Sequence, residues 1–219
     1  SAEDPYVERR PGGWFRHIKE LAAMAVAAGI LIAVLIPGIG QARQAARRVA
    51  CASNLTFISS AVGMYAQANN DQLPSLPIPP NHNWLGLGSG PESHSNAANL
   101  LPLVRERYIT AQRMECPGRN ASDPLPVTPV SNEIPDRNRG YSYINMFGPR
   151  PPIWDGRAST IILTDRNPLF APEAHGTASP ESNSLNHAGQ GNYILAADGS
   201  VSWATTPDIG PNHDTIWTV

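Results

Sequence analysis

The chain has 219 residues, of which 41% are hydrophobic and 16% are charged, and its formal net charge is -2 with histidine counted as neutral. This balance gives no electrostatic reason to expect nucleic acid as a partner, because proteins that bind nucleic acid usually present a basic face. The hydrophobic content argues against a disordered chain, and 22 prolines favour a domain rich in loops.

A polar leader, residues 1–14, precedes a long apolar stretch. No charged residue occurs from Leu21 to Ala42, which matches the roughly 20 apolar positions that a helix needs to cross a bilayer. We therefore predict a membrane-spanning helix over residues 15–40. The residues expected to anchor it are Glu20, Leu21, Ile30, Leu31 and Pro37.

Two residues of this span carry open alternatives. Pro37 removes a backbone donor, so the helix either kinks or unwinds there, or it ends and a second helix begins near Gln41. The carboxylate of Glu20 lies at the membrane-entry end of the span, where it either has a functional role with a partner group or stays at the level of the lipid headgroups beside Lys19. The basic residues on the two sides of the span favour, by a small margin, a cytoplasmic N-terminus.

Residues 41–70 are expected to continue as the amphipathic, periplasmic part of the helix. Apolar residues recur there at spacings of three and four, which places them on one helix face. This stripe consists of Cys51, Leu55, Ile58, Val62 and Tyr65. The stripe needs an apolar partner, which we expect in the loop-rich β domain over residues 71–219.

Within that domain, residues 100–108 predict a short helix. β-Branched and aromatic residues at 141–146 and 160–164 predict strands, and residues 215–219 are a candidate for a last strand.

The clearest hairpin covers residues 192–204, where Asp198-Gly199 separates two apolar runs. A two-residue turn pairs Ile194 with Trp203 and Ala196 with Val201. We therefore expect Ile194, Val201 and Trp203 to form the surface that packs against the helix stripe.

The two cysteines, Cys51 and Cys116, allow one disulfide if the domain lies in an oxidising compartment. The alternative is a pair of buried thiols.

Motifs for enzymatic chemistry are scarce. His187 and Asp198 resemble half of an acid–base pair, but turn chemistry alone explains Asp-Gly, so we favour a loop histidine and a turn aspartate. No third group completes a triad at motif spacing, and the six histidines are too scattered to predict a zinc site. We expect neither enzymatic activity nor a catalytic residue.

As a whole, the chain resembles bacterial pseudopilin-type proteins, which have a prepilin-like N-terminal helix and a C-terminal signature of His, nine residues, then Asp-Gly. The matching residues are Glu20, Pro37, the run 44–48, Cys51, Asn54-Leu55, Cys116-Pro117, the run 159–165, His187 and Asp198-Gly199. The resemblance implies an α+β, pilin-like fold in which a long N-terminal helix packs on a C-terminal antiparallel sheet outside the inner membrane.

The chain departs from the family pattern at two places. If Glu20 is the fifth residue of the mature helix, Phe15 stands where the family's cleavage site has glycine, so we expect the leader to remain attached. Ten residues rather than nine separate His187 from Asp198, which predicts a β-bulge or a longer loop near residues 189–197.

The resemblance implies a non-enzymatic structural protein with a single span in the bacterial inner membrane, a cytoplasmic N-terminus and a periplasmic domain. Its expected role is that of an uncleaved accessory subunit of a larger envelope complex, with membrane lipid and other subunits as partners and no small-molecule substrate. The alternatives are a pseudopilin of a type II secretion or type IV pilus-like filament, and a tethered ligand-binding domain. No cofactor is expected, although some pseudopilins hold calcium, for which Asp155, Asp165, Asp198 or Asp208 could supply oxygens.

Overall fold

The computed structural model describes residues 14–77, 96–119, 140–146, 151–170, 179–210 and 214–217. The predicted leader lies outside these residues, except for Trp14. The chain forms two compact units, Ser1–Ala45 and Ala46–Val219.

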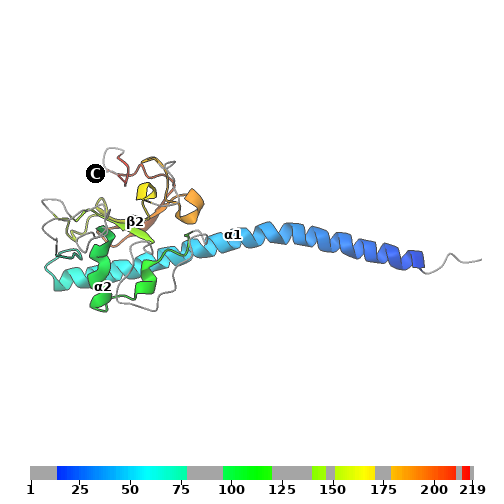
Figure 1. Ribbon diagram of the computed structural model, residues 1–219, viewed down its shortest axis with the longest axis horizontal. Helices are drawn as coiled ribbons and strands as arrows, with labels where there is room; N and C mark the ends of the chain where they lie inside the picture. The colour runs from blue at the N-terminus through cyan, green and yellow to red at the C-terminus, as the bar shows by residue number, and fades with distance from the viewer. Residues whose placement is uncertain are drawn as a thin grey trace, which may run out of the picture. The chain divides into compact units, whose positions relative to one another are not determined.

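The first unit consists of the N-terminal part of helix α1, which covers Trp14–Ala68 (Figure 1). Its large apolar side chains are exposed, including Leu21, Ile30 and Leu31. By length and composition α1 could cross a membrane. The helix continues through Pro37 without a break, so the alternative in which a second helix begins near Gln41 is wrong.

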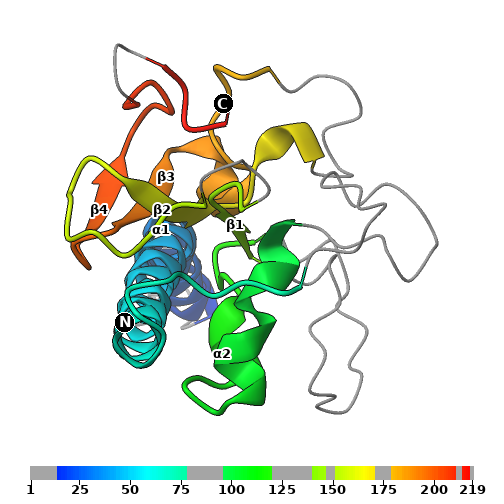
Figure 2. The ribbon, with the colours of Figure 1, turned by 90° about the vertical axis from the view of Figure 1, so that its left-hand side faces the viewer.

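The second unit contains a four-stranded antiparallel sheet in the order β1-β2-β3-β4. The strands are β1 Tyr141–Tyr143, β2 Ile161–Asp165, β3 Asn192–Ala196 and β4 Val201–Ala204. Figure 2 shows the strands side by side across the end of α1, with α2 on the β1 side. The predicted α+β class, a long helix packed on an antiparallel sheet, is confirmed.

Short helical segments lie between α1 and β1 and between β2 and β3. They are η1 Asn96–Leu100, α2 Leu101–Arg105, η2 Ala111–Met114, η4 Pro168–Phe170 and η6 Asn186–Gly189. The last strand expected at residues 215–219 is not formed over the part that is described, where Thr215 makes one isolated bridge to Asp208.

The stripe of α1 forms one side of the hydrophobic core. Leu55, Ile58 and Val62 are fully buried, and Tyr65 packs partly buried against the same cluster. Leu163 of β2 and Leu195 of β3 contribute from the sheet. Complete burial of such a side chain is worth about 1.5–3 kcal/mol, so this contact is a main source of stability for the second unit.

The β3–β4 hairpin differs from the predicted pairing by one residue. Leu195 pairs with Val201 and Tyr193 with Trp203, whereas Ile194 pairs with Ser202. The difference arises because the turn has three residues rather than two. The amide of Gly199 donates to the carbonyl of Ala196 at 3.0 Å. Gly199 itself has φ +87°, so a glycine in the left-handed region closes the loop.

A shift of one residue exchanges the two faces of a strand. The prediction that Ile194 shares a face with Trp203 and packs on the helix is therefore wrong, and Leu195 takes that place. The register irregularity of the sheet lies in β2, between Ile161 and Leu163, opposite Ala196 and Leu195 rather than within residues 189–197.

Gly199 also connects the hairpin to the helix, because its carbonyl accepts a hydrogen bond from Ser59 Oγ at 3.0 Å. A Cβ at this position would have a left-handed backbone and would lie 3.2 Å from the same Oγ. We predict that Gly199→Ala lowers the free energy of unfolding by about 1 kcal/mol. Denaturant titration followed by tryptophan fluorescence measures the change.

Gly63→Ala is the matched control for this change. Gly63 lies inside α1, and a Cβ there meets only an ordinary contact at 3.7 Å with Trp154. The same substitution should stabilise the protein by about 0.5–1 kcal/mol at this site, because alanine favours the helix. Equal effects at the two positions would contradict the assignment of the left-handed turn.

Candidate functional site

Four buried side chains with chemically active groups converge between α1 and the sheet of the second unit. Cys51 comes from α1, Cys116 follows η2, Asp165 ends β2 and His187 lies in η6. Their potential ligand atoms all lie within 4.8 Å of one another. We call these four residues the buried tetrad.

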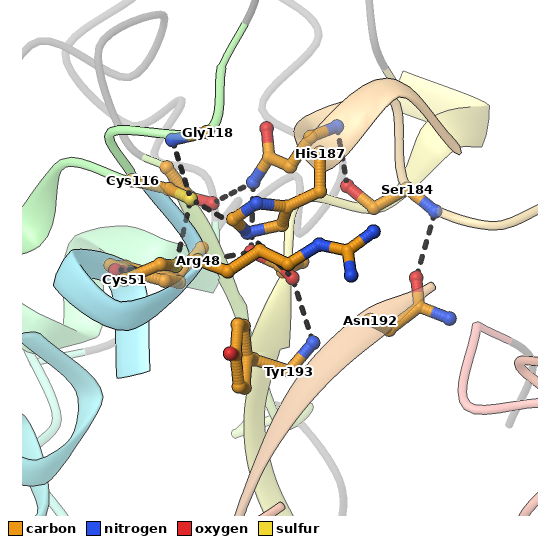
Figure 3. Close-up of polar contacts among 12 residues, drawn as sticks. Arg48, Cys51, Cys116, Gly118, Ser184, His187, Asn192 and Tyr193 are labelled. Atoms are coloured by element: carbon orange, nitrogen blue, oxygen red, sulfur yellow. Dashed lines mark hydrogen bonds and ion pairs between the residues drawn. The ribbon is translucent and has the colours of Figure 1, made fainter. Parts of the chain in front are cut away.

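The contacts within the tetrad are short and mutual. The Sγ atoms of Cys51 and Cys116 are 2.7 Å apart, and Cys116 Sγ lies 3.3 Å from His187 Nε2. His187 Nε2 is 3.6 Å from Asp165 Oδ2, and Cys51 Sγ is 3.7 Å from Asp165 Oδ1. Figure 3 shows the His187 ring pointing toward the two cysteine side chains.

The expected disulfide is not formed. A disulfide requires about 2.05 Å between the sulfurs, whereas these atoms are 2.7 Å apart, and both cysteines are free. The alternative of two buried thiols describes the structure, although the thiols contact each other.

The loop that carries His187 adopts an unusual backbone to bring the ring into the tetrad. His187 and Ala188 have φ +54° and +57°, in the left-handed region that costs a non-glycine residue about 1–2 kcal/mol. The His187 amide donates to the Gly118 carbonyl at 2.9 Å, and a Cβ on Gly118 would collide with the imidazole ring. Strain of this kind concentrates at functional sites.

Asp165 is completely buried, and both of its oxygens are occupied. Oδ1 accepts a hydrogen bond from Asn186 Nδ2 at 3.0 Å, and Oδ2 accepts one from the Tyr193 amide at 2.7 Å. Asn186 also donates to the Gly140 carbonyl at 2.8 Å. These bonds satisfy the carboxylate and fix its direction.

Each thiol has a further polar neighbour. Tyr141 Oη lies 3.2 Å from Cys51 Sγ. The Gly118 amide donates to Cys116 Sγ at 3.4 Å (Figure 3). An amide donor stabilises the deprotonated form of a cysteine, because the thiolate accepts hydrogen bonds better than the thiol.

The surroundings shift the pKa values of the two thiols in opposite directions. Burial raises the pKa of Cys51, as do its hydrogen bond to Cys116 and the charge of Asp165. Burial also opposes ionisation of Cys116, but hydrogen bonds from Cys51 and His187 outweigh it and lower the pKa of Cys116. Burial alone would lower the pKa of His187, yet Asp165 and Cys116 raise it to about 9. Of the two thiols, Cys116 is therefore the one that ionises more readily, and His187 is a neighbour that favours its ionisation.

Aromatic side chains enclose the tetrad on the side of the β3–β4 hairpin. Tyr193 and Trp203 pack edge-on against the His187 ring, with centroids 5.6 and 5.5 Å away. The guanidinium of Arg48 lies 4.7 Å from the centroid of Trp203 and bonds to Gln190. Trp203 lies on the same strand face as Leu195 and Val201, as its pairing with Tyr193 requires, and its ring contacts His187 and Arg48 of α1.

The structure separates His187 from Asp198, the two ends of the sequence signature. His187 belongs to the tetrad, whereas Asp198 is exposed in the turn, where hydrogen bonds from Ser200 lower its pKa. The partner of His187 is Asp165. The hypothesis of a turn aspartate therefore describes Asp198, but His187 is not a simple loop histidine.

The calcium hypothesis gains no support in the described parts of the chain. Of the four aspartates proposed, only Asp165 belongs to a group of three or more potential ligands, and its neighbours there are two thiols and an imidazole. Calcium prefers oxygen ligands.

In the first unit, Glu20 Oε2 lies 3.6 Å from His17 Nδ1.

Sequence reasoning missed Asp165 as the partner of His187, and it missed Tyr141 and Asn186 altogether. The one available signal was a carboxylate at the end of the apolar run 161–165, since a charged residue there must be exposed or paired.

The tetrad does not have the geometry of a nucleophilic relay. In such a relay the two ring nitrogens of histidine contact different partners, the nucleophile and the carboxylate. Here Nε2 faces both Cys116 and Asp165, and Nδ1 has no partner among the described residues. The donor atoms converge on one region, an arrangement that could hold a metal ion.

Comparison with known proteins gives one family match. Residues 40–128 match the model of a family described as a protein of unknown function (DUF1559). The matched segment includes Cys51 and Cys116 and covers less than half of the chain. Neither the search of curated proteins nor that of solved structures produced a match.

The protonation pattern predicts how the thiols titrate in reduced protein treated with a chelator. In the unmodified chain, the absorbance of the Cys116 thiolate should rise with an apparent pKa below the ordinary cysteine value of 9.0. In His187→Gln it should appear at higher pH, because Cys116 loses a hydrogen bond and a neighbouring positive charge. Ultraviolet absorbance against pH measures both.

His17→Gln, which changes an exposed histidine of the first unit, is the control and should leave the titration unchanged. An unchanged titration in His187→Gln would show that His187 does not lower the pKa of Cys116.

Proposed function

We propose that this protein is a non-enzymatic, membrane-anchored, pseudopilin-like structural subunit that belongs to a larger envelope complex of a bacterium. In this proposal α1 spans the inner membrane once, with a cytoplasmic N-terminus, and the second unit faces the periplasm. The observation that carries the proposal is the exposed apolar surface of α1 up to Ile39, on a helix whose last turns form the core of an antiparallel sheet domain.

An apolar surface of this extent needs a cover of lipid or protein, because water is a poor solvent for it. The family match over residues 40–128 begins where the apolar stretch ends, and the α+β fold agrees with the pilin-like resemblance. We also expect that the leader is not removed. Arg16 and Lys19 place charge just before the apolar stretch, and Phe15 stands where the family's cleavage site has glycine.

A structural role also agrees with the buried tetrad. Its members are nearly inaccessible to solvent, so a substrate could not reach Cys116 without an opening of the core. A non-enzymatic subunit needs no such opening.

Membrane insertion provides a direct test of the anchor. We predict that Leu31→Arg, near the middle of the apolar stretch, destabilises insertion by about 2.5–3.5 kcal/mol. Fractionation of cells with alkaline carbonate should then release a large share of the variant from the membrane pellet. Val49→Arg, at a position of α1 that is equally exposed but lies in the second unit, is the control and should stay in the pellet.

The proposed role is tested by extraction in mild detergent, native electrophoresis and mass spectrometry of the band. The chain should migrate with other membrane or envelope proteins in a defined complex. Migration as a free monomer from membranes that retain their other complexes intact would contradict the subunit role.

A filament-forming pseudopilin is the second candidate, supported by the same helix and sheet. Intact-mass measurement distinguishes the two, because a filament subunit should begin at Arg16 and a permanently anchored subunit should retain the residues before it.

A further inference from the structure

We propose that the buried tetrad of Cys51, Cys116, Asp165 and His187 is a structural zinc site that joins α1 to the sheet. The inference does not depend on the function proposed above. It rests on the convergence of the four side chains, on the chemistry of their donor atoms and on the contacts that orient each of them.

The donor atoms match the preferences of zinc. Two cysteine sulfurs, one imidazole nitrogen and one carboxylate oxygen lie within 4.8 Å of one another. Zinc is bound by these groups in tetrahedral sites, whereas calcium and magnesium select oxygen ligands. Four protein ligands fill the coordination sphere, which is typical of structural sites, while catalytic sites keep one position for water.

The charges also favour a cation. A buried aspartate, two thiols and a histidine form an unfavourable group in a core of low polarity unless a partner compensates them. As zinc ligands both cysteines would be thiolates, so a divalent cation would compensate two of the three negative charges of Cys51, Cys116 and Asp165, and His187 would bind as the neutral imidazole.

Polar contacts outside the tetrad lie beside three of the four ligands, as in known metal sites. Asn186 and the Tyr193 amide orient Asp165, the Gly118 amide orients Cys116, and Tyr141 lies beside Cys51. The left-handed backbone at His187 brings its ring to the same point. This strain is explained if the ring has a ligand to bind.

Zinc entry requires a small movement. Two sulfurs bound tetrahedrally at about 2.3 Å from zinc are about 3.8 Å apart, so the pair would separate by roughly 1 Å from its present 2.7 Å. A side-chain rotation of Cys51 or Cys116 provides such a change without moving the helix or the strands.

The test uses the full chain in detergent, reduced, stripped with a chelator and titrated with Zn²⁺ or with Co²⁺ as a spectroscopic probe. We expect one ion per chain, an increase in thermal stability with Zn²⁺, and a visible Co²⁺ spectrum with a sulfur-to-metal charge-transfer band. Cys116→Ser and Asp165→Asn should weaken Zn²⁺ binding at least 10-fold, since even residues behind the ligands contribute 10–100-fold.

Asp198→Asn is the matched control, because this aspartate is exposed in the hairpin turn, and it should bind Zn²⁺ as the unmodified chain does. If the variants fail to fold, the Co²⁺ spectrum of the unmodified chain still decides the question. The proposal is overturned by the absence of stoichiometric Zn²⁺ binding, by a Co²⁺ spectrum without the charge-transfer band, or by isolation of the chain with both thiols oxidised.

Discussion

The architecture of the second unit depends on the burial of one carboxylate, that of Asp165. A buried charge is costly unless hydrogen bonds and opposite charges replace water, and Asp165 finds these on two segments, η6 and β3. Asn186 and Tyr193 bond to its two oxygens, and the imidazole of His187 lies beside it. The end of β2, the start of β3 and the loop between them therefore have one relative arrangement that satisfies the carboxylate.

The helix and the tetrad are linked through the same packing. Cys51 continues the stripe that Leu55, Ile58 and Val62 bury against the sheet, so its thiol is carried to Asp165 by the periodicity of α1. Two glycines permit the remaining approaches, because a Cβ on Gly118 would meet His187 and one on Gly140 would meet Cys116. The packing of α1 on the sheet therefore both stabilises the core and brings Cys51 into the tetrad.

Local patterns in the sequence identified the helix stripe, the approximate strands and the position of the hairpin, because each depends on near neighbours in the chain. The register of the hairpin was harder to predict: a turn of two residues and one of three both accommodate Asp198-Gly199, and the choice between them exchanges the faces of Ile194 and Leu195. The tetrad was not predictable from spacing, since Asp165 and His187 meet only through the tertiary fold. The sequence signature pointed to His187 but suggested Asp198, an exposed turn residue, as its companion.

The members of the tetrad are far apart in the sequence, and this separation constrains the order of folding. Cys51 and Asp165 are 114 residues apart, and Cys116 and His187 are 71 apart, so the site closes long loops, whose entropic cost precedes any gain from the contacts. A chain synthesised from its N-terminus completes the helix long before it supplies His187. Earlier segments, including Leu103 and Met114 of the same core, can pack on the helix stripe first, whereas the tetrad can assemble only after His187 has emerged.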